Sequence, residues 1–226
     1  DNRMEASLVK GMQVFAPKNL REVVKHLENK EKLIATKYKG QINEMENFEL
    51  DYVQVKGQEI AKRAISIAAA GSHGLLMVGS PSSGKTMLSK RIPSILPSME
   101  YQEILESTNI YSILGKLSAD QPYISKRPFR NPHYSISRAG LIGGGSYPKP
   151  GEVSLANKGV LFIDELAELK RDAIEALRTP LEEKKVNIVR NGVTVDFPAD
   201  FLFIAGSNVP TTYLEQSNDL NKVKVA

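Results

Sequence analysis

Residues 79–86, GSPSSGKT, have the types and spacing of a phosphate-binding loop, in which Gly79, Gly84, Lys85 and Thr86 occupy the fixed positions. Glycines allow the backbone to curl so that successive N–H groups point at one phosphate. The lysine can reach the β- and γ-phosphates of ATP, and the threonine hydroxyl can bind Mg²⁺. The alternative is a chance glycine turn, but the apolar run LLMV before the loop and a helical pattern after it provide the context that the motif requires. The predicted nucleotide-binding residues are Gly79, Ser80, Pro81, Ser82, Ser83, Gly84, Lys85 and Thr86.

An acidic pair, Asp164 and Glu165, follows the apolar run VLFI. A carboxylate at the carboxyl end of a parallel strand beside a phosphate loop can hold Mg²⁺, so we expect Asp164 to share the ion with Thr86. Glu165 can then act as the general base that takes a proton from the attacking water. The alternative is a pair of acids that caps the next segment. A general base next to the metal ligand favours an ATPase over a kinase, because a kinase would need a site for a second substrate.

Asn208 comes directly after another apolar run, FLFIAGS. In a parallel sheet its amide would lie between the acidic pair and the γ-phosphate, where it could orient the attacking water. A turn asparagine without a catalytic role is the alternative.

The elements that position these residues belong to a three-layer α/β/α fold. LLMV, VLFI and FLFIA are continuous apolar runs, and strands of this kind belong to parallel sheets that are covered by helices on both faces. Helical spacing precedes LLMV, at Ile60, Ala64, Ile67 and Ala68. The helix after the phosphate loop is expected to be interrupted by prolines. Near the start of the chain, Asn19 is the expected N-cap of a further short helix.

The composition is that of an ordinary globular protein, with 41% hydrophobic and 25% charged residues among 226. With 30 basic and 26 acidic side chains, the net charge of +4 permits a polyanionic partner without requiring one. Cysteine is absent, which excludes disulfides and thiolate metal sites. No apolar run approaches the roughly 20 residues that cross a bilayer, and the first residues lack a signal-peptide core. A cytoplasmic protein with no membrane partner is therefore expected.

Two further segments carry strong local signals. Residues 139–159, AGLIGGGSYPKPGEVSLANKG, contain a glycine-rich stretch that cannot form a regular helix or a central strand. In VNIVRNGVTVDF, residues 186–197, Asn191-Gly192 separates two alternating runs and predicts a two-residue hairpin turn.

Together, GSPSSGKT, RPFRNPHYSISRAGLIGGGSYPKPGEVSLANKGVLFIDEL and FLFIAGSN resemble the magnesium-chelatase-like AAA+ ATPases of the YifB/ComM family. The resemblance implies a P-loop AAA+ core over residues 51–208, with an insertion in its second helix and a β-hairpin before the sensor strand. The insertion would project toward the centre of a ring, and its glycines would let it move. Residues 1–50 resemble the end of a Lon-protease-like domain plus a linker. The tail, 209–226, resembles a piece of the helical lid, and a break in the family pattern is expected between about residues 206 and 213.

The resemblance also implies Mg²⁺-dependent ATP hydrolysis by a ring-forming, hexameric motor that remodels or translocates single-stranded or branched DNA. Arg190 and Lys149 are then the expected contacts with the nucleic-acid backbone, although an arginine also keeps an exposed hairpin soluble. No arginine finger is recognisable, and Arg178 is at most a lesser contact between subunits. Two other functions remain open: a chelatase subunit that drives metal insertion into a tetrapyrrole, and a nucleotide-gated assembly or chaperone module.

Overall fold

A computed structural model describes the chain except for residues 1, 37–47 and 209–226. The predicted lid piece therefore lies outside the described residues. The structure falls into two compact units: the first joins the described part of 1–47 to Ser98–Lys126, and the second joins Phe48–Pro97 to the described part of 127–226. Within the described residues, no helix has the length and apolar character needed to span a bilayer.

The first unit is helical. It contains α1 (Arg3–Ala6), α2 (Leu20–Leu27) and α5 (Tyr101–Ile113). Asn19 is the N-cap of α2 as predicted, and its side chain accepts a hydrogen bond of 3.0 Å from the backbone N–H of Glu22. The Tyr101 hydroxyl donates to the carbonyl of Leu8 at 2.7 Å, which connects the first residue of α5 to the chain just after α1.

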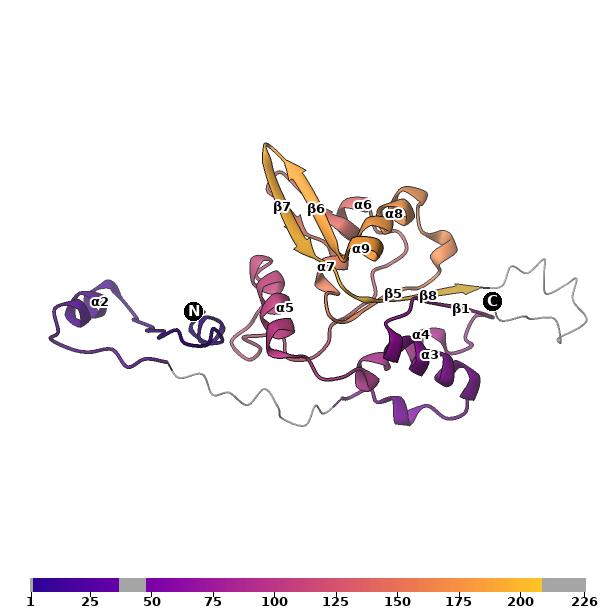
Figure 1. The fold of residues 1–226 in the computed structure, drawn as a ribbon, viewed down its shortest axis with the longest axis horizontal. Coiled ribbons are helices and arrows are strands. Elements are labelled where there is room, and N and C mark those ends of the chain that lie inside the picture. The colour runs from indigo at the N-terminus through magenta and orange to yellow at the C-terminus, as the bar shows by residue number, and fades with distance from the viewer. Residues whose placement is uncertain (1, 37–47, 209–226) are drawn as a thin grey trace, which may run out of the picture. The chain divides into compact units, whose positions relative to one another are not determined.

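The second unit is built on a parallel sheet with the strand order β1-β8-β5-β2. These strands are β1 (Leu75–Gly79), β8 (Leu202–Asn208), β5 (Val160–Ile163) and β2 (Phe129–Arg130). Figure 1 shows α3 and α4 on one face of the sheet and α6 to α9 on the other, which confirms the predicted three layers. The helices of this unit are η1 (Tyr52–Gln54), α3 (Glu59–Gly71), α4 (Lys85–Ser89), η2 (Ile92–Ile95), α6 (Arg138–Ile142), α7 (Glu152–Leu155), η3 (Leu166–Glu168), α8 (Arg171–Ala176) and α9 (Arg178–Glu183).

The strand β5 explains why the layers form on both faces. Its four residues are fully buried, and successive side chains point to opposite faces of the sheet. Val160 and Phe162 pack into the core beneath α3 and α4, whereas Leu161 and Ile163 pack into the core that α6 to α9 cover. A continuous apolar strand thus anchors two cores at once.

The prediction that LLMV is buried was wrong for one of its faces. Leu76 is 54% exposed and Val78 is 56% exposed, because β1 is one of the two edge strands of the described sheet and this face of it lacks a covering helix among the described residues. Part of α3 differs in the same way: Ile60 and Ile67 are exposed, and Ile65 is the large side chain that enters the core. The predicted interruption after the phosphate loop is confirmed, since α4 ends at Ser89 and Pro93 lies in the first turn of η2.

Two antiparallel ribbons belong to the same unit. The glycine-rich segment forms β3 (Gly143–Gly144) and β4 (Lys149–Pro150), and the predicted hairpin forms β6 (Lys185–Arg190) and β7 (Val193–Pro198). The hairpin turn is confirmed: Asn191 and Gly192 both have positive φ, of 49° and 75°, as a two-residue turn of this kind requires.

Candidate active site

The phosphate loop curls through two residues with left-handed backbone, Ser82 at φ 62° and Gly84 at φ 95°. Glycine adopts this conformation without a steric cost, which explains its place before α4. From the start of α3, the Gln58 amide donates a hydrogen bond of 3.3 Å to the carbonyl of Ser83 and so holds the loop from outside.

The sheet order brings the predicted polar residues to the same edge. β8 lies between β1 and β5, so its last residue, Asn208, pairs in register with Gly79 at the start of the loop. Asp164 follows the end of β5 on the other side of β8. At the carboxyl ends of these three strands, the phosphate loop, the Asn208 amide and the Asp164 carboxylate therefore lie side by side.

One short hydrogen bond connects the loop to the acidic pair. The Thr86 hydroxyl donates to Asp164 Oδ2 at 2.7 Å, across 78 residues of sequence. The backbone N–H of Glu165 donates to the other carboxylate oxygen, Oδ1, at 3.1 Å. Asp164 is thereby fixed with one oxygen toward the threonine.

Asn208 joins the lysine to the glutamate. The Lys85 ammonium donates to Asn208 Oδ1 at 3.1 Å and to the carbonyls of Gly79 and Ser80 at 3.1 and 3.0 Å. On its other side, the Asn208 amide donates to Glu165 Oε1 at 3.5 Å. The asparagine thus lies between the Lys85 ammonium and the Glu165 carboxylate.

These side chains line a single cavity of about 310 Å³. Its lining residues are Pro81, Ser82, Ser83, Gly84, Lys85, Thr86, Met87, Asp164, Glu165 and Asn208. Gly79 and Ser80 contribute through the carbonyls that hold Lys85. The volume is at the lower end of the range of ligand-binding pockets.

The donor set fits Mg²⁺ bound together with a nucleotide. A hydroxyl and a carboxylate 2.7 Å apart are hard oxygen ligands, and Mg²⁺ takes one or two such protein groups while phosphates and waters complete its coordination. Among the described residues, no three His, Asp or Glu side chains gather to hold a metal by themselves. Thr86 and Asp164 are therefore the residues that would hold the ion.

The family model for magnesium chelatase, subunit ChlI, matches residues 51–224. The chain belongs to this family. Its similarity extends to two members in particular. The chain is 42% identical to competence protein ComM of Haemophilus influenzae over 93% of its length, and 39% identical to YifB of Escherichia coli over 96%. In both cases it spans 42% of the relative's length.

A solved relative of the magnesium-chelatase family has the same fold. A cryo-EM-based model of the complex between magnesium chelatase subunits BchI and BchD matches 76% of this chain and 57% of its own, with a TM-score of 0.55 and 19% identity. This similarity confirms the predicted AAA+ type of α/β fold.

Glu165 carries backbone strain in this member of the magnesium-chelatase family. Its φ of 54° and ψ of 51° are left-handed, a conformation that is uncommon for a residue with a side chain. This turn, directly after β5, allows the carboxylate to face Asn208 rather than continue along the strand.

Sequence reasoning missed three residues of the site: Gln58, Met87 and Gly206. A Cβ on Gly206 would lie 3.0 Å from Asp164 Oδ1, so this glycine of β8 leaves the space that the carboxylate occupies. A glycine inside an apolar strand is a known signal of close approach, and FLFIAG contains it. For Gln58 and Met87, the sequence offers no comparable signal.

The predicted nucleic-acid contacts lie away from this cavity. Arg190 ends β6, is exposed, and donates to the carbonyl of Val189 at 3.3 Å. Lys149 is exposed on β4. Arg178 forms an exposed ion pair with Glu182 on its own helix at 3.0 Å.

Proposed function

We propose that this site binds ATP with Mg²⁺ and hydrolyses it. The observation that carries the proposal is the convergence of Lys85, Thr86, Asp164, Glu165 and Asn208 on one cavity, from three neighbouring strand ends. A chance phosphate-loop sequence gives no reason for the hydroxyl of Thr86 to meet a carboxylate 78 residues away.

The charges explain why the metal is needed. One ammonium and two carboxylates face the cavity, so the protein alone presents a net negative charge to the phosphates. Bound Mg²⁺ supplies the positive charge that neutralises the β- and γ-phosphate oxygens. When a nucleotide binds, Lys85 would exchange its hydrogen bonds to the carbonyls of Gly79 and Ser80 for contacts with the phosphates. Charged phosphate oxygens bind an ammonium group more strongly than neutral carbonyls do.

The remaining residues act on the attacking water. Glu165 accepts a proton from the water as its oxygen attacks the γ-phosphorus, and the bond to the β–γ bridging oxygen breaks to release ADP and phosphate. Asn208 lies against Glu165 Oε1 and keeps the carboxylate and the water aligned. Because Glu165 acts on the water and not on the nucleotide, it should affect the rate of hydrolysis and leave nucleotide binding unchanged.

We further propose that the protein acts as a homo-oligomeric ring, hexameric in its complete form, and that its substrate is DNA. The support for DNA is the resemblance to the YifB/ComM branch together with exposed basic side chains on the insertion and the hairpin, Lys149 and Arg190. Sequence similarity also favours this branch over a chelatase subunit, because identity is 42% to ComM over 93% of the chain and 23% to the magnesium-chelatase 67 kDa subunit of Chlorobaculum parvum over 68% of it.

The test compares the wild type with Glu165→Gln, using Glu168→Gln as the matched control on the exposed acid three residues further along. Binding of a fluorescent ATP analogue and steady-state phosphate release are measured for each. We expect Glu165→Gln to bind the nucleotide normally and to lose about 10²–10⁴ in turnover, the usual contribution of a general base. Normal hydrolysis by Glu165→Gln would reject the assignment. Turnover measured with and without single-stranded DNA tests the substrate.

A further inference from the structure

The hydrogen bond from Gln58 to the phosphate loop joins two places where the backbone is left-handed. The Gln58 amide donates to the carbonyl of Ser83 at 3.3 Å. Gln58 has a φ of 59°, and Ser82, the neighbour of Ser83, has a φ of 62°. This conformation is disfavoured for a residue with a side chain, so it persists only where the surrounding structure holds it. The contact therefore connects two segments that need support.

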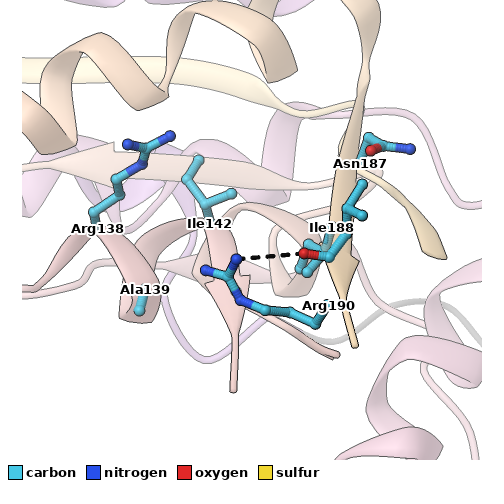
Figure 2. A pocket seen from close by; sticks show the side chains of 8 residues that line it. Arg138, Ala139, Ile142, Asn187, Ile188 and Arg190 are labelled. Atoms are coloured by element: carbon cyan, nitrogen blue, oxygen red, sulfur yellow. Dashed lines mark hydrogen bonds between the residues drawn. The ribbon is translucent and has the colours of Figure 1, made fainter. Parts of the chain in front are cut away.

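Left-handed residues distinguish the proposed nucleotide cavity from a larger pocket of the same unit. That pocket, of about 480 Å³, lies between β6 and α6, and Figure 2 shows Arg138 and Arg190 among the side chains that line it. Apart from Gly143, none of its lining residues has a positive φ. The nucleotide cavity, in contrast, is lined by Ser82 and Glu165, which both have left-handed backbone. Of these two pockets, only the proposed nucleotide site is built on backbone that must be held in place.

The bond from Gln58 fixes the orientation of one peptide group of the loop. In a planar trans peptide, the carbonyl and the N–H that follows it point in opposite directions. The Ser83 carbonyl points to Gln58, which is not among the residues that line the cavity. The N–H of Gly84 belongs to the same peptide group, so it is directed away from Gln58 and toward the cavity that Gly84 lines.

This N–H is available to a ligand. Among the described residues, no backbone or side-chain group accepts a hydrogen bond from the N–H of Gly84. It directly precedes the first N–H groups of α4, which lack partners within their own helix. Successive N–H groups of this kind bind anions. If the peptide between Ser83 and Gly84 turned over, a carbonyl oxygen would face the phosphates in place of a donor and would repel them.

Gln58 is not needed for the task that its position usually carries. It is the N-cap residue of α3, and such residues commonly accept a hydrogen bond from the first turn of their helix. The Gln58 side chain makes no capping hydrogen bond. Its amide instead reaches across 25 residues of sequence to the loop.

We propose that Gln58 is a positioning residue for nucleotide binding. Its amide keeps the peptide between Ser83 and Gly84 turned so that the N–H, and not the carbonyl oxygen, faces the phosphates. The inference rests on the proposed function and adds to that site a residue from the start of α3. Because Gln58 acts through the loop and does not line the cavity, it determines the affinity for the nucleotide and leaves the rate of hydrolysis at saturating ATP unchanged.

The experiment compares the wild type, Gln58→Met, Ser82→Gly and the double variant. Methionine has the length of glutamine and is likewise unbranched at Cβ, but it lacks the amide donor. Gln102→Met, at an exposed glutamine on α5, is the control for the same chemical change. For each protein, the affinity for a fluorescent ATP analogue with Mg²⁺, the KM and kcat for ATP, and the unfolding temperature are measured.

Gln58→Met is expected to bind the analogue about 2- to 12-fold more weakly than the wild type, the effect of losing one hydrogen bond. The KM for ATP should rise by the same factor while kcat stays within about twofold of the wild type. The unfolding temperature should match that of Gln102→Met. A residue that only stabilises the fold would instead lower the unfolding temperature and the kcat, and would leave KM unchanged.

Ser82→Gly tests whether Gln58 acts through the conformation of the loop. Glycine adopts left-handed backbone without a steric cost, so the loop of this variant needs less support. Gln58→Met should therefore weaken binding less in the Ser82→Gly background than in the wild type. Such non-additivity is expected of two residues that act on one backbone conformation. Equal losses in the two backgrounds would overturn the inference.

Two further results would also overturn it: wild-type affinity in Gln58→Met, or a fall in kcat at constant KM. Either one would leave the proposed ATPase intact if the wild type binds and hydrolyses ATP. If the wild type binds the analogue without hydrolysing ATP, the hydrolysis proposal fails, and the binding measurements decide the role of Gln58. If the wild type binds no nucleotide, both proposals are rejected.

Discussion

The molecule contains two glycine-rich segments, and they use the same residue for different physical reasons. In the phosphate loop, a Cβ on Gly84 would meet only the flexible end of Met87, at 3.4 Å, so the glycine is there for its φ of 95°. In the insertion, a Cβ on Gly151 would lie 2.4 Å from the backbone nitrogen of Gly143 and 2.5 Å from the Leu141 carbonyl. The loop needs glycine for its left-handed backbone turn, whereas the insertion needs glycine because two backbones lie in contact.

This difference changes the interpretation of the insertion. Its glycines were expected to provide freedom of movement, but Gly143 and Gly151 face each other in a contact that no side chain could enter. The neighbouring Gly144 pairs with Lys149 in the short ribbon. A tightly closed base therefore supports the exposed β3–β4 turn that carries Tyr147.

The comparison predicts its largest effect in the phosphate loop. Lys85→Ala should weaken ATP binding by on the order of 100-fold or more, because charge-assisted hydrogen bonds to phosphates are lost. The unfolding temperature should change little. Binding of a fluorescent ATP analogue measures the effect, and Lys90→Ala, an exposed lysine at the end of α4, is the control. Equal affinity in the two variants would remove Lys85 from the site.

In the insertion, the expected effect is on stability. Gly151 has an ordinary φ of −99°, so Gly151→Ala tests the steric contact alone. We expect a loss of about 1–3 kcal/mol in the free energy of unfolding, as for overpacked sites. Gly74→Ala is the control, since its Cβ would meet nothing closer than 3.8 Å. Denaturant titration compares the two variants. Equal stability would show that the backbone contact at Gly151 is not tight and that the insertion is a loosely packed loop.

A smaller effect should appear at Gly206, where a glycine makes room for a site residue. Gly206→Ala would push Asp164 Oδ1 by a few tenths of an ångström, since the added Cβ would lie 3.0 Å away. We expect the Mg²⁺ concentration needed for half-maximal ATP turnover to rise roughly tenfold, as when a metal ligand loses its support. The same Gly74→Ala control applies, and an unchanged Mg²⁺ requirement would contradict the role.

The smallest effect concerns the base of the insertion and the hairpin, where Asp200 accepts from Lys158 at 2.9 Å and pairs with Lys184 at 3.0 Å. Burial raises the pKa of Asp200, but the hydrogen bonds and charges of the two lysines outweigh it, so its pKa is lower than usual. The pairing therefore stabilises the fold at pH values above about 4, the ordinary aspartate pKa, and is lost as the pH falls through the lower folded value.

Asp200→Asn should accordingly lower the unfolding temperature modestly at neutral pH, and the difference from the wild type should vanish in acid. Thermal unfolding followed from pH 7 to pH 3 tests this. A difference that persisted or grew toward low pH would show that Asp200 acts through something other than its charge.

Sequence could predict the parts of the site that depend on local spacing and on strand ends. Lys85 and Thr86 follow from the loop motif, and Asp164 follows from its place after a buried strand in a parallel sheet. The contact of Gln58 with Ser83 spans 25 residues and depends on the left-handed backbone of Gln58 at the start of α3. No sequence pattern predicts either feature.

Burial was harder to predict than strand identity. LLMV and VLFI look alike in the sequence, yet Val78 is exposed and Phe162 is fully buried. The difference comes from their places in the sheet, at the edge and in the interior, and from the helices that cover them. The hydrogen bond from the Asn191 amide of the hairpin turn to the Ser146 carbonyl of the insertion likewise forms across 45 residues.

The most direct test of the central claim is phosphate release from ATP by the purified protein, measured with Mg²⁺ and with EDTA, for the wild type and Asp164→Asn. The proposed site predicts turnover that requires Mg²⁺ in the wild type, and turnover reduced in Asp164→Asn even at saturating Mg²⁺. Hydrolysis that continued in EDTA, or that was equal in the two proteins, would contradict it.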